Sequence, residues 1–466
     1  MKKIILFILT ILIISSVYGQ DITGPWNGIL KVQGMQLRIV FHITLTDEGY
    51  IATMDSPDQG AYDIPATSAS YENSELVINI ANLGIEYKGT LGMNDSITGT
   101  FTQTGYSFPL NLTREIPEKE AMVRPQEPVE PYPYYSEDVR FENIEDHIVL
   151  AGTLTMPDKE GSSPAVILIS GSGPQNRDEE VYGHKPFLVL ADHLTKTGIA
   201  VLRYDDRGTG ESTGDFTTAT STNLATDVES AIKYLQTRQE INKQQIGLIG
   251  HSEGGIIAPM VAGKNKNINF IVLLAGTGIP GDQLLLMQQE LLLKARGISD
   301  KELQNAKDFT KGAYNIILET KNTDSVKSVL TAYFKQNSKN FPNSLKPEGI
   351  SEDDMIALQV NQLSSPWIIF FIKYDPVPAL EKVKCPVLAI NGEKDIQVPA
   401  DVNLKAIENA LKKGGNHNVT IKALPGLNHL FQECETGLSG EYSQIEQTFS
   451  PVALTEITNW ILQQVK

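Results

Sequence analysis

One serine in the sequence stands in a pattern that serves nucleophilic catalysis. Gly250-His251-Ser252-Glu253-Gly254 has the form GxSxG, in which a sharp turn between a strand and a helix exposes the hydroxyl of the central serine. Glycine is needed at both ends because side chains there would collide across a strained turn. We therefore predict that Ser252 is a nucleophile and that the neighbouring side chain of His251 points away from it.

The residues on either side of this pentapeptide have the patterns of a strand and a helix, the two elements that such a turn connects. An apolar run at 246–249 is typical of a buried strand, and small or apolar residues at 255–258 suit the start of a helix. The chain contains 37 glycines, so a bare GxSxG is weak evidence. The flanking strand and helix favour a catalytic serine over a structural glycine turn.

A serine hydroxyl needs a base to remove its proton, and histidine suits this role near neutral pH. Of the seven histidines, five lie in the N-terminal part, ahead of the turn or within it, which leaves His417 and His429. His417 precedes the last expected strand, whereas His429 follows it. Because open α/β sheets carry their chemistry at the carboxyl ends of the strands, we predict His429 as the base. The alternative is a loop histidine bonded to backbone.

The base in turn needs an acid that fixes its tautomer and stabilises its cation. Asp395 follows a strand expected at 386–390 and therefore leaves the same edge of the sheet. Its rivals are Glu393, which lies in the turn itself, Asp375, and Asp401, which is placed to cap the next helix. We predict Asp395 as the acid.

Strand and helix patterns alternate through the unit that we expect at 136–466. The expected strands are a hairpin at 140–143 and 147–155, followed by 165–169, 199–204, 246–249, 270–274, 386–390 and 419–421. The expected helices are 187–197, 224–236 and 452–463. This alternation predicts an α/β fold with a mostly parallel sheet covered on both faces. The mainly helical stretch at 279–380 is too long for a connection and predicts a cap over the site.

A separate all-β unit is expected at 20–113. Short alternating runs at 28–32, 37–43, 75–80 and 97–101 are punctuated by turn residues, which predicts a small antiparallel barrel or sandwich. Its opening segment at 24–28 resembles the first strand of lipocalin-like barrels. The proline-rich stretch at 114–135 predicts an extended, semi-rigid linker. Contact with a glycan or envelope component and a plain spacer role are both open for this β unit.

Residues 1–19 have the pattern of a signal peptide: two lysines, an apolar run and a plausible cleavage site before Gln20. We therefore expect an exported protein, periplasmic or secreted, with no stable membrane insertion once the signal is removed. A net charge of −17 argues against nucleic acid and anionic membrane surfaces as partners. Cys385 and Cys434 leave either one bridge or two free thiols open, and no Cys/His spacing predicts a metal site.

The chain order Ser252, Asp395, His429 is that of the α/β-hydrolase fold. Residues 140–466 resemble an α/β hydrolase with a helical cap, similar to exported bacterial carboxylesterases and serine-aminopeptidase-like hydrolases. The segments that carry this resemblance are 169–174, 205–212, 250–254, 391–395 and 428–429. It implies an oxyanion hole made by the backbone N–H groups of Glu253 and Ser172. Many family members have histidine where this chain has Ser170.

The sequence thus predicts a serine hydrolase that cleaves a small carboxylic ester through an acyl-enzyme and needs no metal or organic cofactor. An amidase or aminopeptidase acting on short peptides is an alternative, because ester and amide cleavage share the same triad. A second alternative is an exported binding protein whose hydrolase unit is silent. The intact set of Ser252, Asp395 and His429 argues against that second alternative.

Overall fold

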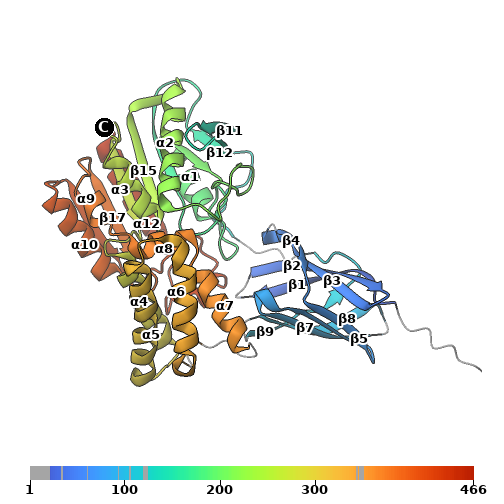
Figure 1. Cartoon of the computed structure of the whole chain (residues 1–466). Helices are drawn as coiled ribbons and strands as arrows, with labels where there is room; N and C mark the ends of the chain where they lie inside the picture. The colour runs from blue at the N-terminus through green and yellow to red at the C-terminus, as the bar shows by residue number, and fades with distance from the viewer. Residues whose placement is uncertain are drawn as a thin grey trace, which may run out of the picture.

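The structure is a computed structural model that describes residues 21–32, 35–59, 61–92, 94–103, 106–118, 124–342, 345 and 351–466. The signal peptide predicted at 1–19 lies outside the described residues. The described chain forms two β-sheets in two units that lie side by side (Figure 1). Cys385 and Cys434 are both free thiols.

The N-terminal unit is one curved antiparallel sheet, a half-barrel. Its strands run in the order β4-β3-β2-β1-β10-β8-β7-β6-β5, with β9 paired to β8. The strands are β1 (Gly24–Val32), β2 (Met35–Thr46), β3 (Gly49–Ser56), β4 (Ala61–Pro65), β5 (Ser68–Glu72), β6 (Glu75–Ile80), β7 (Ile85–Leu91), β8 (Ser96–Gln103), β9 (Tyr106–Pro109) and β10 (Leu112–Thr113). The prediction of an all-β unit is confirmed, and a single curved sheet forms it.

Alternation of buried and exposed side chains holds this half-barrel together. Trp26, Phe41 and Tyr87 come from three different strands and are fully buried on its inner side. Asn73 and Ser74 both adopt positive φ, 51° and 67°, in the two-residue turn between β5 and β6. A tight hairpin requires that geometry because its twist then matches the twist of the strands.

The C-terminal unit contains an eight-stranded sheet in the order β11-β12-β14-β13-β15-β16-β17-β18. The hairpin β11 (Tyr135–Asn143) and β12 (Ile148–Met156) pairs antiparallel with the rest. All other neighbours pair parallel, and these strands are β13 (Ser163–Ile169), β14 (Ala200–Tyr204), β15 (Ile241–His251), β16 (Phe270–Leu274), β17 (Val387–Gly392) and β18 (Val419–Leu424).

Helices cover both faces of this sheet because its strands are apolar on both sides. In β13, Ala165 and Ile167 face one core, whereas Val166 and Leu168 face the other. The first core is closed by α2 (Ser221–Thr237), α3 (Gly254–Ala262) and α10 (Ala400–Lys413). The second is closed by α1 (Pro186–Lys196) and α12 (Pro451–Gln464).

A helical insertion separates β16 from β17. It comprises α4 (Gly281–Ala295), α5 (Asp300–Glu319), α6 (Thr323–Gln336), the short turn η3 (Ser338–Asn340), α7 (Glu352–Leu363), α8 (Pro366–Lys373) and α9 (Val377–Leu380). The insertion has its own core, and its α7 lies on the side of the N-terminal unit (Figure 1). There α7 contacts η2 (Ala81–Leu83). Among the described residues no single helix is long and apolar enough to cross a membrane, although α7 and α8 pass together as a pair bent by 62°.

The linker is fastened to the C-terminal unit where it is described, from residue 124 onward. Arg124 donates to the carbonyl oxygens of Gly183, Ser443 and Ile445, each at 2.9 Å. The side chain of Gln126 exchanges hydrogen bonds of 2.7–2.9 Å with the backbone around Phe449. This part of the linker therefore differs from the semi-rigid tether that its prolines predict, because polar side chains bind it to two loops.

Candidate active site

The candidate nucleophile lies in a strained turn at the end of β15. Ser252 adopts a φ of 51°, a left-handed conformation that is rare for a residue with a side chain. A Cβ at Gly250 would overlap the backbone of Gly254, and a Cβ at Gly254 would overlap the carbonyl oxygen of Ile169. Both glycines are thus required by close backbone approach, which is the reason that the sequence pattern implied.

The parallel strands bring four loops to one edge of the sheet. Gly250 pairs in register with Ile169 of β13, and Gly392 of β17 pairs with Leu424 of β18. The loop that follows each strand therefore begins at the same level. These loops carry Ser172, Ser252, Asp395 and His429, which are separated by up to 257 positions in the sequence.

The candidate base and acid are in contact. Nδ1 of His429 lies 2.7 Å from Oδ2 of Asp395, and both side chains are buried. The other carboxylate oxygen, Oδ1, accepts the backbone N–H groups of Gln397 at 2.8 Å and Val398 at 2.9 Å. These bonds fix the carboxylate, so Nδ1 of His429 donates to it and Nε2 is left for the cavity that His429 shares with Ser252.

Bonds between two loops position this pair. The backbone N–H of Lys394 donates to the carbonyl oxygen of Leu427 at 3.0 Å, which joins the loop of the acid to the loop of the base. Asn428 is fully buried, and its side-chain oxygen accepts the N–H groups of Leu430 and Gln432. The residue just before the histidine thus shapes the turn that presents it.

Two backbone N–H groups are the candidates for an oxyanion site. Ser172 lines the cavity in the loop after β13, and Glu253 follows Ser252 at the start of α3. Among the described residues, neither backbone N–H donates to a protein acceptor. An oxyanion site requires N–H groups that are free of protein acceptors, so both groups remain candidates for it.

The loop after β13 is braced by charged residues. Arg177 binds Asp205 through two nitrogens, at 2.7 and 3.1 Å. Ser170, at the position where many family members have histidine, donates to Asp206 at 2.8 Å. The other oxygen of Asp206 accepts the N–H of Gln175 at 3.0 Å, and burial raises the pKa of Asp206 well above its usual value.

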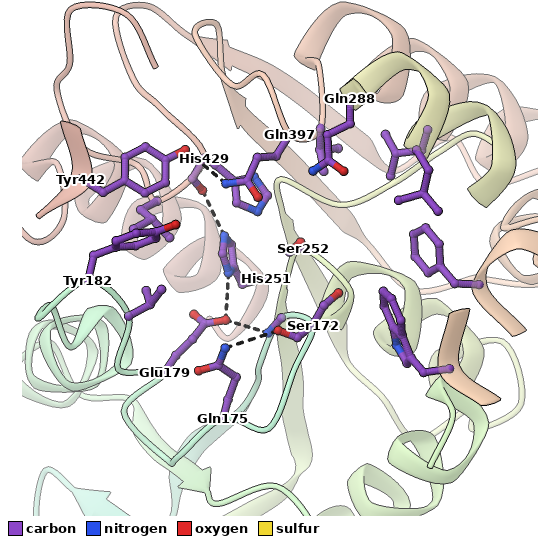
Figure 2. Close-up of a pocket in the computed structure, with 18 residues that line it drawn as sticks. Ser172, Gln175, Glu179, Tyr182, His251, Ser252, Gln288, Gln397, His429 and Tyr442 are labelled. Carbon is purple, nitrogen blue, oxygen red and sulfur yellow. Dashed lines mark hydrogen bonds and ion pairs between the residues drawn. The ribbon is translucent and has the colours of Figure 1, made fainter. Parts of the chain in front are cut away.

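His251 corrects one sequence prediction, because its ring lines the same cavity as Ser252 (Figure 2). Nδ1 lies 2.9 Å from Oε1 of Glu179, and Nε2 lies 3.0 Å from the backbone oxygen of His429. Oε1 of Glu179 also accepts the N–H of Gly171 at 2.7 Å. Partners for both ring nitrogens hold the side chain inward instead of away from the site.

The protons of this contact can be assigned from its chemistry. A carbonyl oxygen only accepts, so Nε2 of His251 carries a hydrogen. One further proton lies between Nδ1 and Glu179, and the pair is neutral overall whichever atom holds it. Burial lowers the pKa of His251, but the Glu179 carboxylate outweighs burial and raises that pKa above its ordinary value. The network joins the Ser172 loop to the backbone of His429.

The side chain of Glu253 joins the turn to the helical insertion. Its Oε1 accepts the hydroxyl of Ser221 at 2.5 Å and the indole N–H of Trp367 in α8 at 2.8 Å. Glu253 is 2% exposed, and burial raises the pKa of its carboxyl. The side chain of Glu253 therefore has a structural role of its own.

Two further loops wall the cavity and are tied to each other. His184 is buried, with Nδ1 3.0 Å from the hydroxyl of Thr448 and Nε2 2.8 Å from the carbonyl oxygen of Tyr442. Burial lowers the pKa of His184 to about 4, so the ring is neutral near pH 7. Tyr182 and Tyr442 meet edge to face, with ring centroids 5.2 Å apart, and Arg124 of the linker binds both loops.

The resulting cavity has a volume of about 300 Å³, at the small end of the usual range for ligand sites. One side is apolar and belongs to the insertion, with Leu284 and Leu285 from α4 and Trp367 and Phe371 from α8. The remaining lining residues are Gly171, Ser172, Gln175, Glu179, Val181, Tyr182, His251, Ser252, Gln288, Gln397, Val398, His429, Leu430 and Tyr442.

The rival candidates lie away from the cavity lining. Glu393 and His417 are exposed, Asp375 accepts the N–H of Val377 at 3.0 Å, and Asp401 lies in the first turn of α10. The sequence missed Glu179, Tyr182, Gln397 and Tyr442 as lining residues. No local pattern distinguishes Glu179 from its exposed neighbour Glu180.

Comparison with known proteins agrees with this architecture. A family model described as serine aminopeptidase, S33, matches residues 185–329, a range that includes Ser252. Esterase EstD of Thermotoga maritima is 24% identical over 418 residues, which cover 88% of this chain and 79% of the esterase. An uncharacterised 31.7 kDa protein of Escherichia coli is 23% identical over 281 residues, 58% of this chain and 87% of that protein.

Among solved structures, an esterase of Pyrococcus furiosus has a TM-score of 0.44 and 19% identity, covering 75% of this chain and 100% of that one. Est1E of Butyrivibrio proteoclasticus, solved with ferulic acid bound, has a TM-score of 0.40 and 17% identity and covers 70% of this chain and 99% of that one. The order of the C-terminal sheet, the family match and the relation to EstD show that the chain resembles α/β hydrolases of esterase-like type.

Proposed function

We propose that the chain cleaves small carboxylic esters through an acyl-enzyme, with Ser252 as nucleophile, His429 as base and Asp395 as the acid that orients the base. The observation that carries the proposal is the 2.7 Å contact between His429 and Asp395 beside a serine held at a φ of 51°. The esterase relative supports the reaction class.

In this mechanism Nε2 of His429 takes the proton of the Ser252 hydroxyl, and the serine oxygen attacks the ester carbonyl. The backbone N–H groups of Glu253 and Ser172 stabilise the negative charge that develops on the carbonyl oxygen. The alcohol leaves with a proton from His429, and water then repeats the same steps on the acyl-enzyme. Asp395 holds Nδ1 throughout, so the cation on His429 stays next to a buried carboxylate.

We further propose that the helical insertion is a cap that binds the acyl group. Leu284, Leu285, Trp367 and Phe371 offer an apolar surface to the cavity. A volume of about 300 Å³ favours short acyl chains. Rates for p-nitrophenyl esters should therefore fall as the acyl chain grows beyond a few carbons.

Peptide cleavage is the second candidate, and the family match to a serine aminopeptidase is what favours it. An aminopeptidase needs a carboxylate for the free amino group of its substrate. Among the described residues, Glu179 is the one acidic side chain that lines the cavity, and it already bonds to His251 and Gly171. We therefore expect acyl esters to react much faster than aminoacyl anilides, and the opposite ranking would favour the peptidase.

The proposal is tested by labelling with a fluorophosphonate and by turnover of p-nitrophenyl acetate. Ser252→Ala should abolish both. Ser328→Ala, the same change on the exposed surface of α6, should keep both at the level of the unaltered protein. Unchanged turnover in Ser252→Ala would assign the chemistry to another residue. Absence of labelling in well-folded protein would favour the non-catalytic binding protein.

Export remains a proposal that rests on the sequence of residues 1–19. We propose a periplasmic or secreted enzyme whose N-terminal half-barrel contacts a glycan or another envelope component. Fractionation of cells that produce the full chain tests the location. Removal of residues 1–19 should retain the protein in the cytoplasm, and export without them would contradict the proposal.

A further inference from the structure

The active-site cavity is polar but offers no free charge to a substrate. Among the described residues no lysine or arginine lines it, and its single carboxylate, Glu179, is neutralised by His251. A charged group in the substrate would lose its water there without gaining an ionic partner, which is unfavourable. The cavity therefore suits an uncharged substrate.

Three glutamines provide much of the remaining polarity, and they come from three separate elements. Gln175 lies in the loop after β13, Gln288 in α4 and Gln397 in the loop after β17, and Figure 2 shows them around the cavity. An amide group has two donor hydrogens and an acceptor oxygen. Amides therefore bind hydroxyl groups, which also donate and accept.

Much of this hydrogen-bonding capacity is unused by the protein. Gln397 donates to the hydroxyl of Tyr442 at 3.2 Å, and Gln175 has a long contact of 3.4 Å with the carbonyl oxygen of Ser172. No described residue hydrogen-bonds the side-chain oxygen of either glutamine, the amide of Gln288 or the hydroxyl of Tyr182. These groups are left for water or for a ligand.

The position of the base indicates which half of the ester meets these groups. The leaving alcohol must take its proton from Nε2 of His429, so it lies on the side of the cavity that His429 occupies. Gln397 lies two residues after Asp395, the partner of His429, and its amide contacts Tyr442. The apolar residues of α4 and α8 are then left for the acyl group.

Tyr182 supports a specific role for this side of the cavity. It adopts a φ of 53°, and Glu179 in the same loop adopts 50°. Left-handed conformations are unfavourable for residues other than glycine and are concentrated at functional sites. A ring held in this way next to Tyr442 offers a flat surface to a ligand, as well as a hydroxyl.

We propose that the alcohol portion of the substrate is neutral and carries several hydroxyl groups, as a sugar or another polyol does. Gln397, Gln288 and Tyr182 bind it beside His429, while the apolar residues of α4 and α8 bind a short acyl group. This inference rests on the proposed esterase function and specifies its substrate class.

The test compares esters that share one acyl group and differ in the alcohol. Methyl 6-O-acetylglucoside is matched with cyclohexylmethyl acetate, and glycerol 1-acetate with propyl acetate. We expect kcat/KM to be at least about tenfold higher for the hydroxylated member, since a site built to bond hydroxyls rejects analogues that lack them. A preference within the first pair alone indicates a sugar ring, and a preference within both indicates polyols in general.

Gln288→Leu and Gln397→Leu should each lower this preference several-fold. Gln362→Leu is the matched control, because Gln362 is an exposed residue of α7 in the same insertion. Both rates are measured on one preparation, so loss of folded protein cancels from the ratio.

Equal rates within both pairs would overturn the inference and leave the esterase proposal intact. The inference would also be overturned if both leucine variants kept the full preference for the hydroxylated ester. If the unaltered protein hydrolyses neither the four esters nor p-nitrophenyl acetate, the esterase proposal itself fails, and the proposed substrate class fails with it.

Discussion

Trp367 of the helical insertion donates its indole N–H to the buried carboxyl of Glu253, the residue that follows the candidate nucleophile, at 2.8 Å. The same carboxyl oxygen accepts the hydroxyl of Ser221 in α2. One buried side chain therefore links the turn, a helix of the sheet layer and the wall of the cavity. The position of α8 and the geometry of the turn are expected to depend on each other.

Trp367→Phe tests this link. The change removes the N–H donor and keeps an aromatic ring, and the loss of a partner from a buried polar group costs about 1–3 kcal/mol. We expect a lower melting temperature together with a several-fold loss of kcat/KM for short acyl esters.

Trp460→Phe is the matched control for this variant. Its indole donates to Thr420 at 3.0 Å, between α12 and β18 and outside the cavity lining. It should lower the melting temperature alone. Equal effects of the two variants on kcat/KM would contradict a specific role for the Trp367 contact.

Asp395→Asn tests the orientation of the base. Oδ1 of Asp395 already accepts two backbone N–H groups, so the new amide nitrogen would take the place of Oδ2 and face Nδ1 of His429. Nδ1 of His429 would then have to accept a hydrogen bond from the amide. The ring hydrogen moves to Nε2, so Nε2 can no longer take a proton. We expect kcat to fall on the order of 10⁴-fold.

Glu393→Gln controls for the loss of a nearby negative charge, because Glu393 is exposed in the same loop. Its kcat should stay close to that of the unaltered protein. A larger loss in Glu393→Gln than in Asp395→Asn would reverse the assignment of the acid.

Glu179→Gln tests the contact that joins the donor loop to His429. If the amide oxygen keeps the bond to Gly171, His251 must carry a positive charge without its counterion in order to donate from Nδ1. If the amide nitrogen turns toward His251, Gly171 loses its acceptor. We expect kcat to fall about tenfold at pH 8, the cost of roughly one hydrogen bond.

The pH profile separates this role from a general loss of stability. Lower pH protonates His251 and restores its donor, so the ratio of variant to unaltered kcat should rise from pH 8 toward pH 6. Glu180→Gln, at the exposed neighbour, should give a ratio near one throughout. A constant low ratio for Glu179→Gln would mean that protonation of His251 plays no part.

His184 makes folding depend on pH in a defined direction. Its pKa is about 4 in the folded protein, below its ordinary value of 6.5, so the unfolded chain binds a proton first as the pH falls. The stabilising contribution is complete above pH 6.5 and is lost progressively toward pH 4. Melting temperature measured between pH 7 and pH 4 should therefore fall.

The difference between variants isolates this histidine. In His184→Gln, the fall in melting temperature over that window should be smaller by several degrees, because each pKa unit of the shift is worth about 1.4 kcal/mol and each kcal/mol about 2–4 °C in a large domain. His417→Gln, at an exposed histidine, should behave like the unaltered protein. An identical fall in His184→Gln would show that His184 binds its proton equally in both states.

Local patterns were enough to predict the two units and to select candidate residues that the structure brings to one edge of the sheet. Apolar runs marked the strands, and all of those expected in the C-terminal unit overlap observed strands. The strict glycine requirement of the turn identified Ser252 before any contact was known. Chain order and sheet edges then selected Asp395 and His429. The first, third and several later strands of the half-barrel were shortened or missed because their alternation is interrupted by polar and small residues.

The sequence by itself determined which groups are available for chemistry and that they follow strands at one edge of a sheet, because both depend on short-range periodicity and backbone sterics. Only the tertiary structure decided what surrounds them. The turn of His251 toward Glu179, the link from Glu253 to Trp367 and the binding of the linker by Arg124 join residues that are 72, 114 and up to 321 positions apart. Such contacts follow from the packing of whole elements, which no local pattern encodes.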